Sequence, residues 1–236
     1  MTLRRLMSLV RKAIDDYNLI EENDKIAVGI SGGKDSLTLL YALAGIRRFY
    51  PRHFELTAVC VDLGFEGFDL SPVEQLCREL DVPFHVVHSD IGRIIFEDRK
   101  EKNPCSLCAK MRKGALNTAM KELGCNKLAL GHHKDDAVET FIMNLFQEGR
   151  VGCFQPVTYL SRKDLTMIRP MVMAEESMIS AAVHHENLPV VKSKCPADGN
   201  TNREKTKEWI RMMDKESKGF KKRLYGALER GHISGF

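Results

Sequence analysis

Long apolar runs are absent from this sequence of 236 residues. No segment approaches the about 20 consecutive apolar residues that a membrane-spanning helix requires. The basic residues 1–6 are not followed by the uninterrupted apolar core of a secretory signal. Apolar side chains at positions 3, 6, 7, 10 and 14 instead predict an N-terminal amphipathic helix. These absences exclude a membrane protein and favour a cytoplasmic one.

A second Cys-x-x-Cys pair is also absent, although the chain contains seven cysteines. In a reducing cytoplasm such cysteines serve packing, metal binding or catalysis rather than disulfides. The hydrophobic content of 43% and the charged content of 29% are ordinary for a globular domain. Function must therefore be inferred from local patterns.

The most informative pattern is a strand, a loop and a helix near the N-terminus. Residues 25–30 are apolar and β-branched, as in a strand buried on both faces, and helical spacing begins at Leu37. Between them lies the glycine loop, Ser31-Gly32-Gly33-Lys34-Asp35-Ser36. Glycines let backbone N–H groups approach an anion, and the helix N-terminus favours negative charge. With Lys34 as a cation and Asp35 as a magnesium ligand, the loop predicts a phosphate site. The alternative is a plain glycine turn with both side chains in solvent.

Strands and helices alternate along the rest of the chain. The predicted strands cover residues 25–30, 54–62, 84–88, 127–131 and 167–169, and the later helices cover 71–80, 108–123 and 175–186. Such alternation predicts an α/β fold, a Rossmann-like, doubly wound parallel sheet of about five strands. We expect an N-terminal helix over 1–24, a domain over 25–193 that carries the phosphate site and the Cys-x-x-Cys pair, and a C-terminal segment over 194–236 with Cys195 and a basic extension. Residues 97–103 are highly charged and predict a surface loop.

A second polar motif follows the fourth predicted strand, Gly131-His132-His133-Lys134-Asp135-Asp136. Asp135 and Asp136, called the Asp pair below, would cap the next helix, or bind magnesium or accept protons in a nucleotide site. Asp62 ends the second predicted strand. Ligands of parallel sheets bind at the carboxyl ends of the strands, so the glycine loop, Asp62 and the Asp pair should share one crevice.

Cys105 and Cys108 begin a predicted helix, where its dipole favours thiolates. Such a pair is a redox couple, half of a zinc site or part of an iron–sulfur site. Cys195 is the one later cysteine in a polar, turn-rich stretch. Three cysteines would leave one iron of a [4Fe–4S] cluster without a protein ligand. The remaining cysteines, Cys60, Cys77, Cys125 and Cys153, are predicted to be structural.

The glycine loop has neither the Gly-x-x-x-x-Gly-Lys-Ser/Thr spacing nor the Gly-x-Gly-x-x-Gly spacing. It resembles the pyrophosphate loop of the PP-loop ATPases, which cleave ATP between the α and β phosphates and adenylate a substrate. Together with Pro-Cys-Ser-Leu-Cys-Ala-Lys-Met-Arg at 104–112 and Gly-His-His-Lys-Asp-Asp at 131–136, the chain resembles the tRNA 2-thiocytidine synthetase family over about residues 25–195.

The resemblance implies thiolation of a tRNA cytidine with ATP, Mg²⁺ and a [4Fe–4S] cluster. It gives the catalytic roles to Lys34, Asp35, Asp135 and Asp136. The nucleotide would lie on Ser31, Gly32, Gly33, Lys34, Asp35, Ser36, Asp62 and Gly131, and the cluster on Cys105, Cys108 and Cys195. The implied partners are tRNA and a sulfur donor, such as a cysteine desulfurase or free sulfide, and a homodimer is compatible with the sequence.

Two other functions stay open at this stage. One is a cluster-free PP-loop ligase of the lysidine synthetase type, and the other is a non-catalytic ATP- or cluster-binding RNA partner. Residues 201–236 contain ten Lys or Arg and five Asp or Glu, a net charge of +5. This basic tail could contact RNA, but we favour a solvated helix whose aromatics, Trp209, Phe220 and Tyr225, dock on the core. Arg112 is either a surface residue or a group that neutralises a leaving group.

Overall fold

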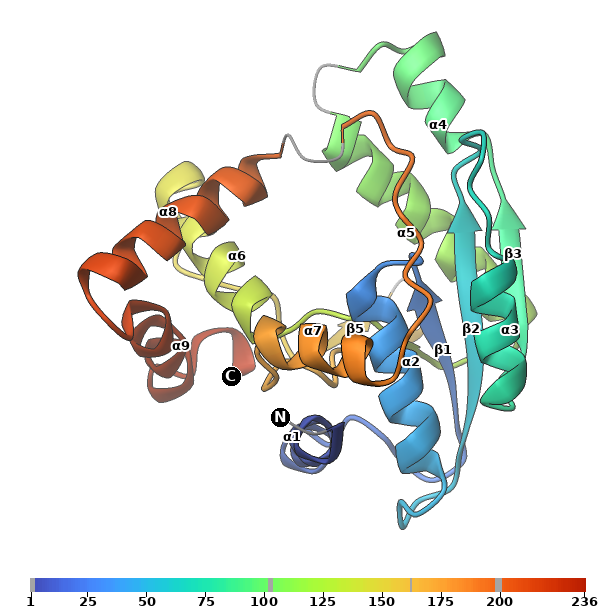
Figure 1. The fold of residues 1–236 in the computed structure, drawn as a ribbon, viewed down its shortest axis with the longest axis horizontal. Helices are drawn as coiled ribbons and strands as arrows, with labels where there is room; N and C mark the ends of the chain where they lie inside the picture. The colour runs from blue at the N-terminus through green and yellow to red at the C-terminus, as the bar shows by residue number, and fades with distance from the viewer. Residues whose placement is uncertain (1–2, 102–103, 162, 198–200) are drawn as a thin grey trace.

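A computed structural model describes residues 3–101, 104–161, 163–197 and 201–236. Its centre is a six-stranded sheet of order β3-β2-β1-β4-β6-β5 (Figure 1). The strands are β1 (Asp24–Ile30), β2 (Phe54–Asp62), β3 (Phe84–His88), β4 (Lys127–Ala129), β5 (Val157–Leu160) and β6 (Leu165–Ile168). All neighbours are parallel except β5, which is antiparallel to β6. The predicted doubly wound α/β fold is confirmed.

The sixth strand, β5, is the one that the sequence does not predict. Its four residues include no buried side chain, because it forms the edge of the sheet beside β6. An apolar run of the kind that marks the central strands is therefore missing from it. At the other strands the predicted positions agree with the structure to within about two residues.

Helices cover both faces of the sheet. They are α1 (Leu3–Asp16), α2 (Lys34–Arg47), α3 (Ser71–Glu79), α4 (Ile91–Arg93), α5 (Pro104–Glu122), α6 (Lys134–Gln147), α7 (Glu176–His185), α8 (Asn202–Glu216) and α9 (Phe220–Arg230). Alternate residues of β1 divide between the two faces. Ile26 and Val28 belong to the main core with α1 and α2, whereas Ala27 packs into a smaller cluster with Met120 of α5. Burial on both faces explains the apolar sequence of β1.

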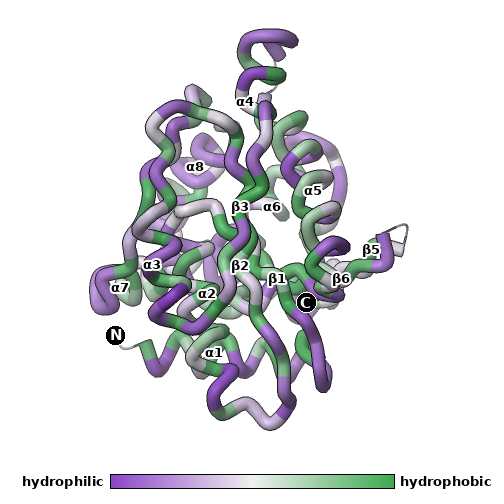
Figure 2. The backbone as a smooth tube through the Cα atoms, turned by 90° about the vertical axis from the view of Figure 1, so that its right-hand side faces the viewer, coloured by the Kyte–Doolittle hydropathy of each residue, from purple (hydrophilic) through white to green (hydrophobic). Residues whose placement is uncertain are grey.

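Helices α1, α3 and α9 are clearly amphipathic, whereas α2 is buried on most sides. Hydrophilic and hydrophobic residues are mixed along the helical tubes in Figure 2. Within the described ranges, no helix combines the length and the apolar character needed to cross a bilayer. The charged stretch 97–103 is only partly a loop. A π-helix covers Ile94–Asp98, residues 99–101 are irregular, and residues 102–103 lie outside the described part.

The basic tail forms α8 and α9, which lie beside α6 (Figure 1). Trp209 contacts Phe146 and Phe220, with ring centroids 5.6 and 5.9 Å apart. The Tyr225 hydroxyl is buried and donates to the carbonyl oxygen of Val172 at 3.0 Å. Trp209 and Tyr225 belong to the main core or pack against it, as predicted, whereas Phe220 contacts Trp209. The helices are not fully solvated, because some of their basic side chains turn inward. The three-segment division of the chain stays a prediction.

Candidate functional site

The glycine loop lies where β1 meets α2, at the carboxyl edge of the sheet. Gly32 has a φ of +79°, a left-handed conformation that favours glycine. The Ser36 hydroxyl closes the loop, because it accepts from the Ser31 N–H at 3.2 Å and donates to the Gly33 carbonyl at 2.9 Å. The loop is thereby shaped before any ligand binds, with its backbone turned around the N-terminus of α2.

The two predicted motifs meet at Gly131. A Cβ atom on Gly131 would lie 3.0 Å from the carbonyl oxygen of Asp35 and 3.1 Å from the amide nitrogen of Ser36. Any side chain there would push the segment after β4 away from the glycine loop. Gly131 therefore allows the segment that carries the Asp pair to approach the glycine loop closely.

We expect Gly131→Ala to cost about 1–3 kcal/mol of folding stability, because the backbone it meets cannot move aside without strain. The same change should weaken ATP binding, since the glycine loop must shift. Thermal unfolding and ATP titration of the purified variant measure both effects. Gly114→Ala is the matched control. Apart from its own helix, no atom of the described residues lies within 4 Å of its Cβ position in α5, and the change should stabilise the protein by about 0.5–1 kcal/mol. Unchanged stability and ATP binding in Gly131→Ala would contradict this role.

His133 lies between the carboxylates of the two motifs. Its Nε2 is 3.7 Å from Asp35 Oδ1 and 3.4 Å from Asp136 Oδ2. Its Nδ1 accepts from the Asp136 N–H at 3.4 Å, while the His133 N–H donates to Asp136 Oδ2 at 2.9 Å, which forms a capping box at the start of α6. Because Nδ1 accepts, the neutral ring carries its proton on Nε2, between Asp136 and Asp35.

Lys34 faces acidic partners. Its Nζ lies 2.6 Å from Asp35 Oδ1 and 3.2 Å from Glu176 Oε1. Burial favours the neutral amine, but these carboxylates outweigh it and raise the pKa of Lys34. Burial would raise the pKa of Glu176, yet Lys207 and Lys34 together lower it to about 2. Both groups are therefore charged at neutral pH.

A nucleotide-sized cavity of about 480 Å³ opens beside the glycine loop. Ser31, Gly33 and Asp62 line it, with Leu63 and Phe65 after β2 and a segment over residues 190–195, called the strap. The strap is fixed to the loop, because the Val191 N–H donates to the Gly32 carbonyl at 2.9 Å. Lys34, Asp35, Ser36 and the Asp pair do not line this cavity; they lie at the start of α2 and α6 beside it.

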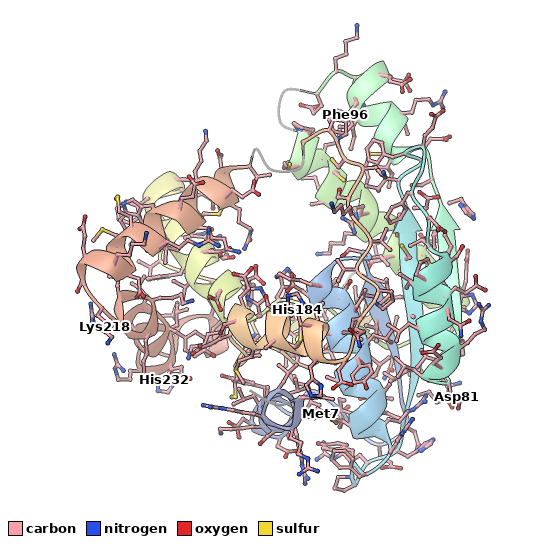
Figure 3. The ribbon with its side chains drawn as sticks, in the orientation of Figure 1. Met7, Asp81, Phe96, His184, Lys218 and His232 are labelled. Carbon is pink, nitrogen blue, oxygen red and sulfur yellow. The ribbon has the colours of Figure 1, made fainter. Side chains whose placement is uncertain are left out.

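Cys105, Cys108 and Cys195 line a second cavity, of about 250 Å³. Phe96, labelled in Figure 3, is also part of its lining. Burial raises the pKa of the Cys108 thiol, the Arg112 guanidinium opposes this, and Cys195 and Cys105 raise it further. The three predicted thiols are therefore neighbours, although Cys195 is far from the other two in sequence.

The two cavities are adjacent and share part of their walls. Leu63, Phe65, Arg112, Ser193 and Cys195 belong to the walls of both. Across the described ranges, no three His, Cys, Asp or Glu side chains converge as ligands of one metal ion do. The cysteines of a [4Fe–4S] cluster bind different irons and so stand farther apart. Three soft thiols around one cavity therefore fit a cluster better than a single zinc ion.

The remaining cysteines have structural surroundings. Cys60, Cys77 and Cys125 are buried, and burial raises the pKa of the Cys60 and Cys77 thiols to about 11. The Cys153 thiol donates to the carbonyl oxygen of Ala137 at 3.2 Å, and burial raises its pKa to about 12. None of the four lines either cavity.

The sequence patterns did not identify four charged residues near the Asp pair: Glu176, Arg203, Lys207 and Lys221. Lys221 forms an ion pair with the Asp135 carboxylate, and Arg203 forms one with Asp136 at 3.0 Å. Lys207 lies 2.5 Å from Glu176. The net positive charge of the tail was the one available signal. It indicated basic residues without showing that three of them turn inward.

His132 differs from His133, since its ring lies against Phe154 at a centroid distance of 5.1 Å and its buried Nδ1 has no partner among the described residues. Burial, followed by the charge of Arg169, lowers its pKa to about 4. Below about pH 6.5 the unfolded chain therefore binds a proton that the folded chain does not. Stability should fall as the pH drops from about 6.5 to about 4, by at most about 3 kcal/mol from this group.

Comparing wild type with His132→Asn by denaturant unfolding at several pH values isolates the contribution of His132. As the pH falls, wild type should lose stability relative to the variant. Only wild type contains the histidine that takes up a proton on unfolding. A difference that stays constant between pH 7 and pH 4 would contradict a neutral His132 in the folded state.

A parallel sheet with a glycine loop after β1 and a carboxylate pair after β4 defines a PP-loop protein, and residues 3–213 match the family described as a PP-loop domain. The tRNA-cytidine(32) 2-sulfurtransferase of Syntrophotalea carbinolica is 41% identical over 228 residues, which cover 95% of this chain and 88% of that protein. The enzyme of the same name from Geobacter sulfurreducens is 39% identical, with 95% and 89% covered. The chain belongs to the tRNA-cytidine(32) 2-sulfurtransferase family, so the family resemblance of its motifs is confirmed.

Solved structures agree with this assignment. The U34-tRNA thiolase NcsA from Methanococcus maripaludis, solved with its [4Fe-4S] cluster, superposes with a TM-score of 0.78 at 26% identity, over 96% of this chain and 77% of that chain. The NH3-dependent NAD synthetase from Campylobacter jejuni has a TM-score of 0.54 at 13% identity and covers 100% of this chain and 97% of its own. The latter likeness concerns the fold alone.

Proposed function

We propose that this protein is a cytoplasmic, ATP-dependent sulfurtransferase that replaces the C2 oxygen of cytidine 32 in tRNA with sulfur. The observation that carries the proposal is the shared wall between the nucleotide-sized cavity and the cavity of the three cysteines. A base activated in the first cavity would lie next to sulfur chemistry in the second. The names of the relatives support tRNA as the substrate.

In the first step the cytidine C2 oxygen attacks the α-phosphorus of ATP, and pyrophosphate leaves. The N–H groups of the glycine loop and the Lys34 ammonium stabilise the charge that develops on the phosphates. Asp35, with His133 and the Asp pair beside it, would supply carboxylate ligands for the magnesium ion that accompanies ATP. In the second step a sulfide-level sulfur attacks C2, and AMP leaves with the original oxygen.

Cys105, Cys108 and Cys195 would hold a [4Fe–4S] cluster, whose fourth iron has no protein ligand and supplies a binding site for the sulfur to be transferred. The protein contributes the cavity around the three cysteines. Arg112 belongs to both cavity walls and favours negative charge near Cys108. This supports the second sequence interpretation of Arg112, a group that neutralises a leaving anion. The sulfur donor and the homodimer stay predictions.

Contact with tRNA is supported by cations at the mouth of the site. Lys192 and Lys194 of the strap line the nucleotide-sized cavity together with Arg112. For these three side chains the structure records no carboxylate within ion-pair distance in the described ranges. Unpaired cations of this kind suit RNA phosphates.

The test is a complete reaction with protein purified without oxygen. Iron and acid-labile sulfide are measured per chain, and the protein is then incubated with ATP, Mg²⁺, sulfide and unmodified tRNA. We expect about four iron and four sulfide per chain, with 2-thiocytidine at position 32 and one AMP formed per base. ATP cleavage without iron and without thiolation would instead indicate a cluster-free PP-loop ligase. A protein that binds ATP or iron but releases no pyrophosphate with tRNA would be a non-catalytic partner.

A further inference from the structure

The two C-terminal helices supply cations to the Asp pair. α8 and α9 follow the strap in sequence and lie beside α6 (Figure 1). Side chains of α8 and α6 meet between the two helices (Figure 3). Arg203 of α8 and Lys221 of α9 contact the Asp pair, and Lys207 of α8 contacts the neighbouring Glu176.

Arg203 has the most contacts. Its Nη1 donates to Asp136 Oδ1 at 3.0 Å and to Glu139 Oε2 at 3.1 Å, and its Nη2 donates to Thr140 Oγ1 at 3.2 Å. These acceptors occupy positions i, i+3 and i+4 of α6 and so lie on one face of the helix. The other oxygen of Asp136 accepts from the His133 N–H at 2.9 Å. The carboxylate is thereby held from two sides, with its plane fixed.

Lys221 holds the other member of the pair. Its ammonium donates to Asp135 Oδ1, while the Glu176 N–H at the start of α7 donates to Asp135 Oδ2 at 2.8 Å. The Asp135 side chain is only 6% exposed. Three helices, α6, α7 and α9, therefore meet at this one carboxylate.

The charges of the cluster nearly balance. Five carboxylates meet four cations there, namely Asp35, Asp135, Asp136, Glu139 and Glu176 with Lys34, Arg203, Lys207 and Lys221. Counted with every carboxylate ionised and His133 neutral, the cluster has an excess of one negative charge, and burial of Glu139 raises the pKa of that carboxyl. Removal of one cation from the C-terminal helices would double this excess among half-buried groups, where repulsion is weakly screened.

We propose that Arg203 and Lys221 are positioning residues, which orient the Asp pair toward Asp35 and make α8 and α9 part of the catalytic unit. This inference rests on the proposed function, because it assigns the Asp pair to the reaction. A purely structural role is the alternative, in which the ion pairs only dock the helices.

The experiment compares Arg203→Ala and Arg203→Lys with Lys205→Ala, an exposed lysine of the same helix. Arg203→Ala should lower the kcat of tRNA-dependent AMP formation about tenfold to a hundredfold, as expected for lost hydrogen bonds to charged groups. The Kd for ATP should stay within about twofold. Arg203→Lys should retain an intermediate rate, because its ammonium keeps the charge but cannot reach three acceptors. Added guanidinium ion should restore part of the activity of Arg203→Ala, and Lys205→Ala should match wild type.

Lys221→Met should lower kcat about threefold to tenfold. Lys222→Met, which changes the exposed neighbour, should leave kcat unchanged.

Two results would overturn the proposal. One is a wild-type kcat in Arg203→Ala. The other is a loss of activity that follows unfolding and is not rescued by Arg203→Lys or guanidinium. Mn²⁺ binding in the presence of a non-hydrolysable ATP analogue provides a readout that needs no tRNA. We expect weaker Mn²⁺ binding in Arg203→Ala, because the loss of the fixed Asp136 orientation outweighs the added negative charge. Inactive wild type with tRNA would overturn the proposed function, whereas unchanged Mn²⁺ binding in Arg203→Ala would overturn the positioning role.

Discussion

Replacing Cys195 with alanine is expected to reduce the iron content from about four per chain to nearly none and to abolish thiolation. Cys195 lies far in sequence from Cys105 and Cys108 but lines the same cavity. Two cysteines alone would leave two irons of the cluster without protein ligands, and such a cluster is readily lost. Iron and sulfide analysis of protein prepared without oxygen measures the effect, with Cys105→Ala as the parallel variant.

The matched control is Cys77→Ala, which changes a buried cysteine that lines neither cavity. It should keep wild-type iron content and lose at most about 1 kcal/mol of stability, as expected for a small change in the core. ATP binding to Cys195→Ala should persist, because the glycine loop is untouched. Full iron content in Cys195→Ala would show that another residue completes the ligand set and would remove Cys195 from the site.

Replacing Asp35 with alanine is expected to lower AMP formation about a thousandfold, with thiolation lost in proportion. Asp35 is the carboxylate shared by both motifs, since it pairs with Lys34 and faces the His133 Nε2. Its loss would remove the carboxylate proposed to bind magnesium and release Lys34 from one of its partners, and each such electrostatic group is commonly worth about 10²–10³ in rate. Pyrophosphate release under saturating ATP and tRNA is the measurement.

Asp35→Asn keeps the size of the side chain and tests charge alone, so it should be nearly as inactive as Asp35→Ala. Both variants should retain their iron, because the cluster cavity does not include residue 35. Normal AMP formation in either variant would contradict the assignment of the glycine loop to ATP chemistry, whereas normal AMP formation without thiolation would move Asp35 to the second step.

The sequence predicted those parts of the site that depend on local backbone requirements. The glycine loop needs Gly32 at positive φ, and Gly131 must lack a side chain where it meets Asp35. Both requirements leave a glycine at a fixed offset from a strand. The alternation of strands and helices then determined that the two motifs share one edge of the sheet, because a parallel sheet brings the carboxyl ends of its strands together.

The sequence indicated which cysteines form the site but not where Cys195 lies. Cys105 and Cys108 are about one helical turn apart, so their spacing alone places them side by side. The position of Cys195 depends on the path of the strap. Only the tertiary structure decided that this path begins with a hydrogen bond to the glycine loop and ends at the second cavity.

The contacts of α8 and α9 were beyond the reach of the sequence. Arg203 and Lys221 are separated by 67 and 86 residues from the carboxylates they hold, and no periodicity in the tail distinguishes them from exposed neighbours such as Lys205 and Lys222. The sequence by itself determined the fold class, the glycine loop and the place of the Asp pair at the same edge of the sheet, because these follow from local conformation and chain order. Only tertiary structure decided which cations reach the Asp pair, because an ion pair between distant helices depends on how the helices pack and how far their side chains extend.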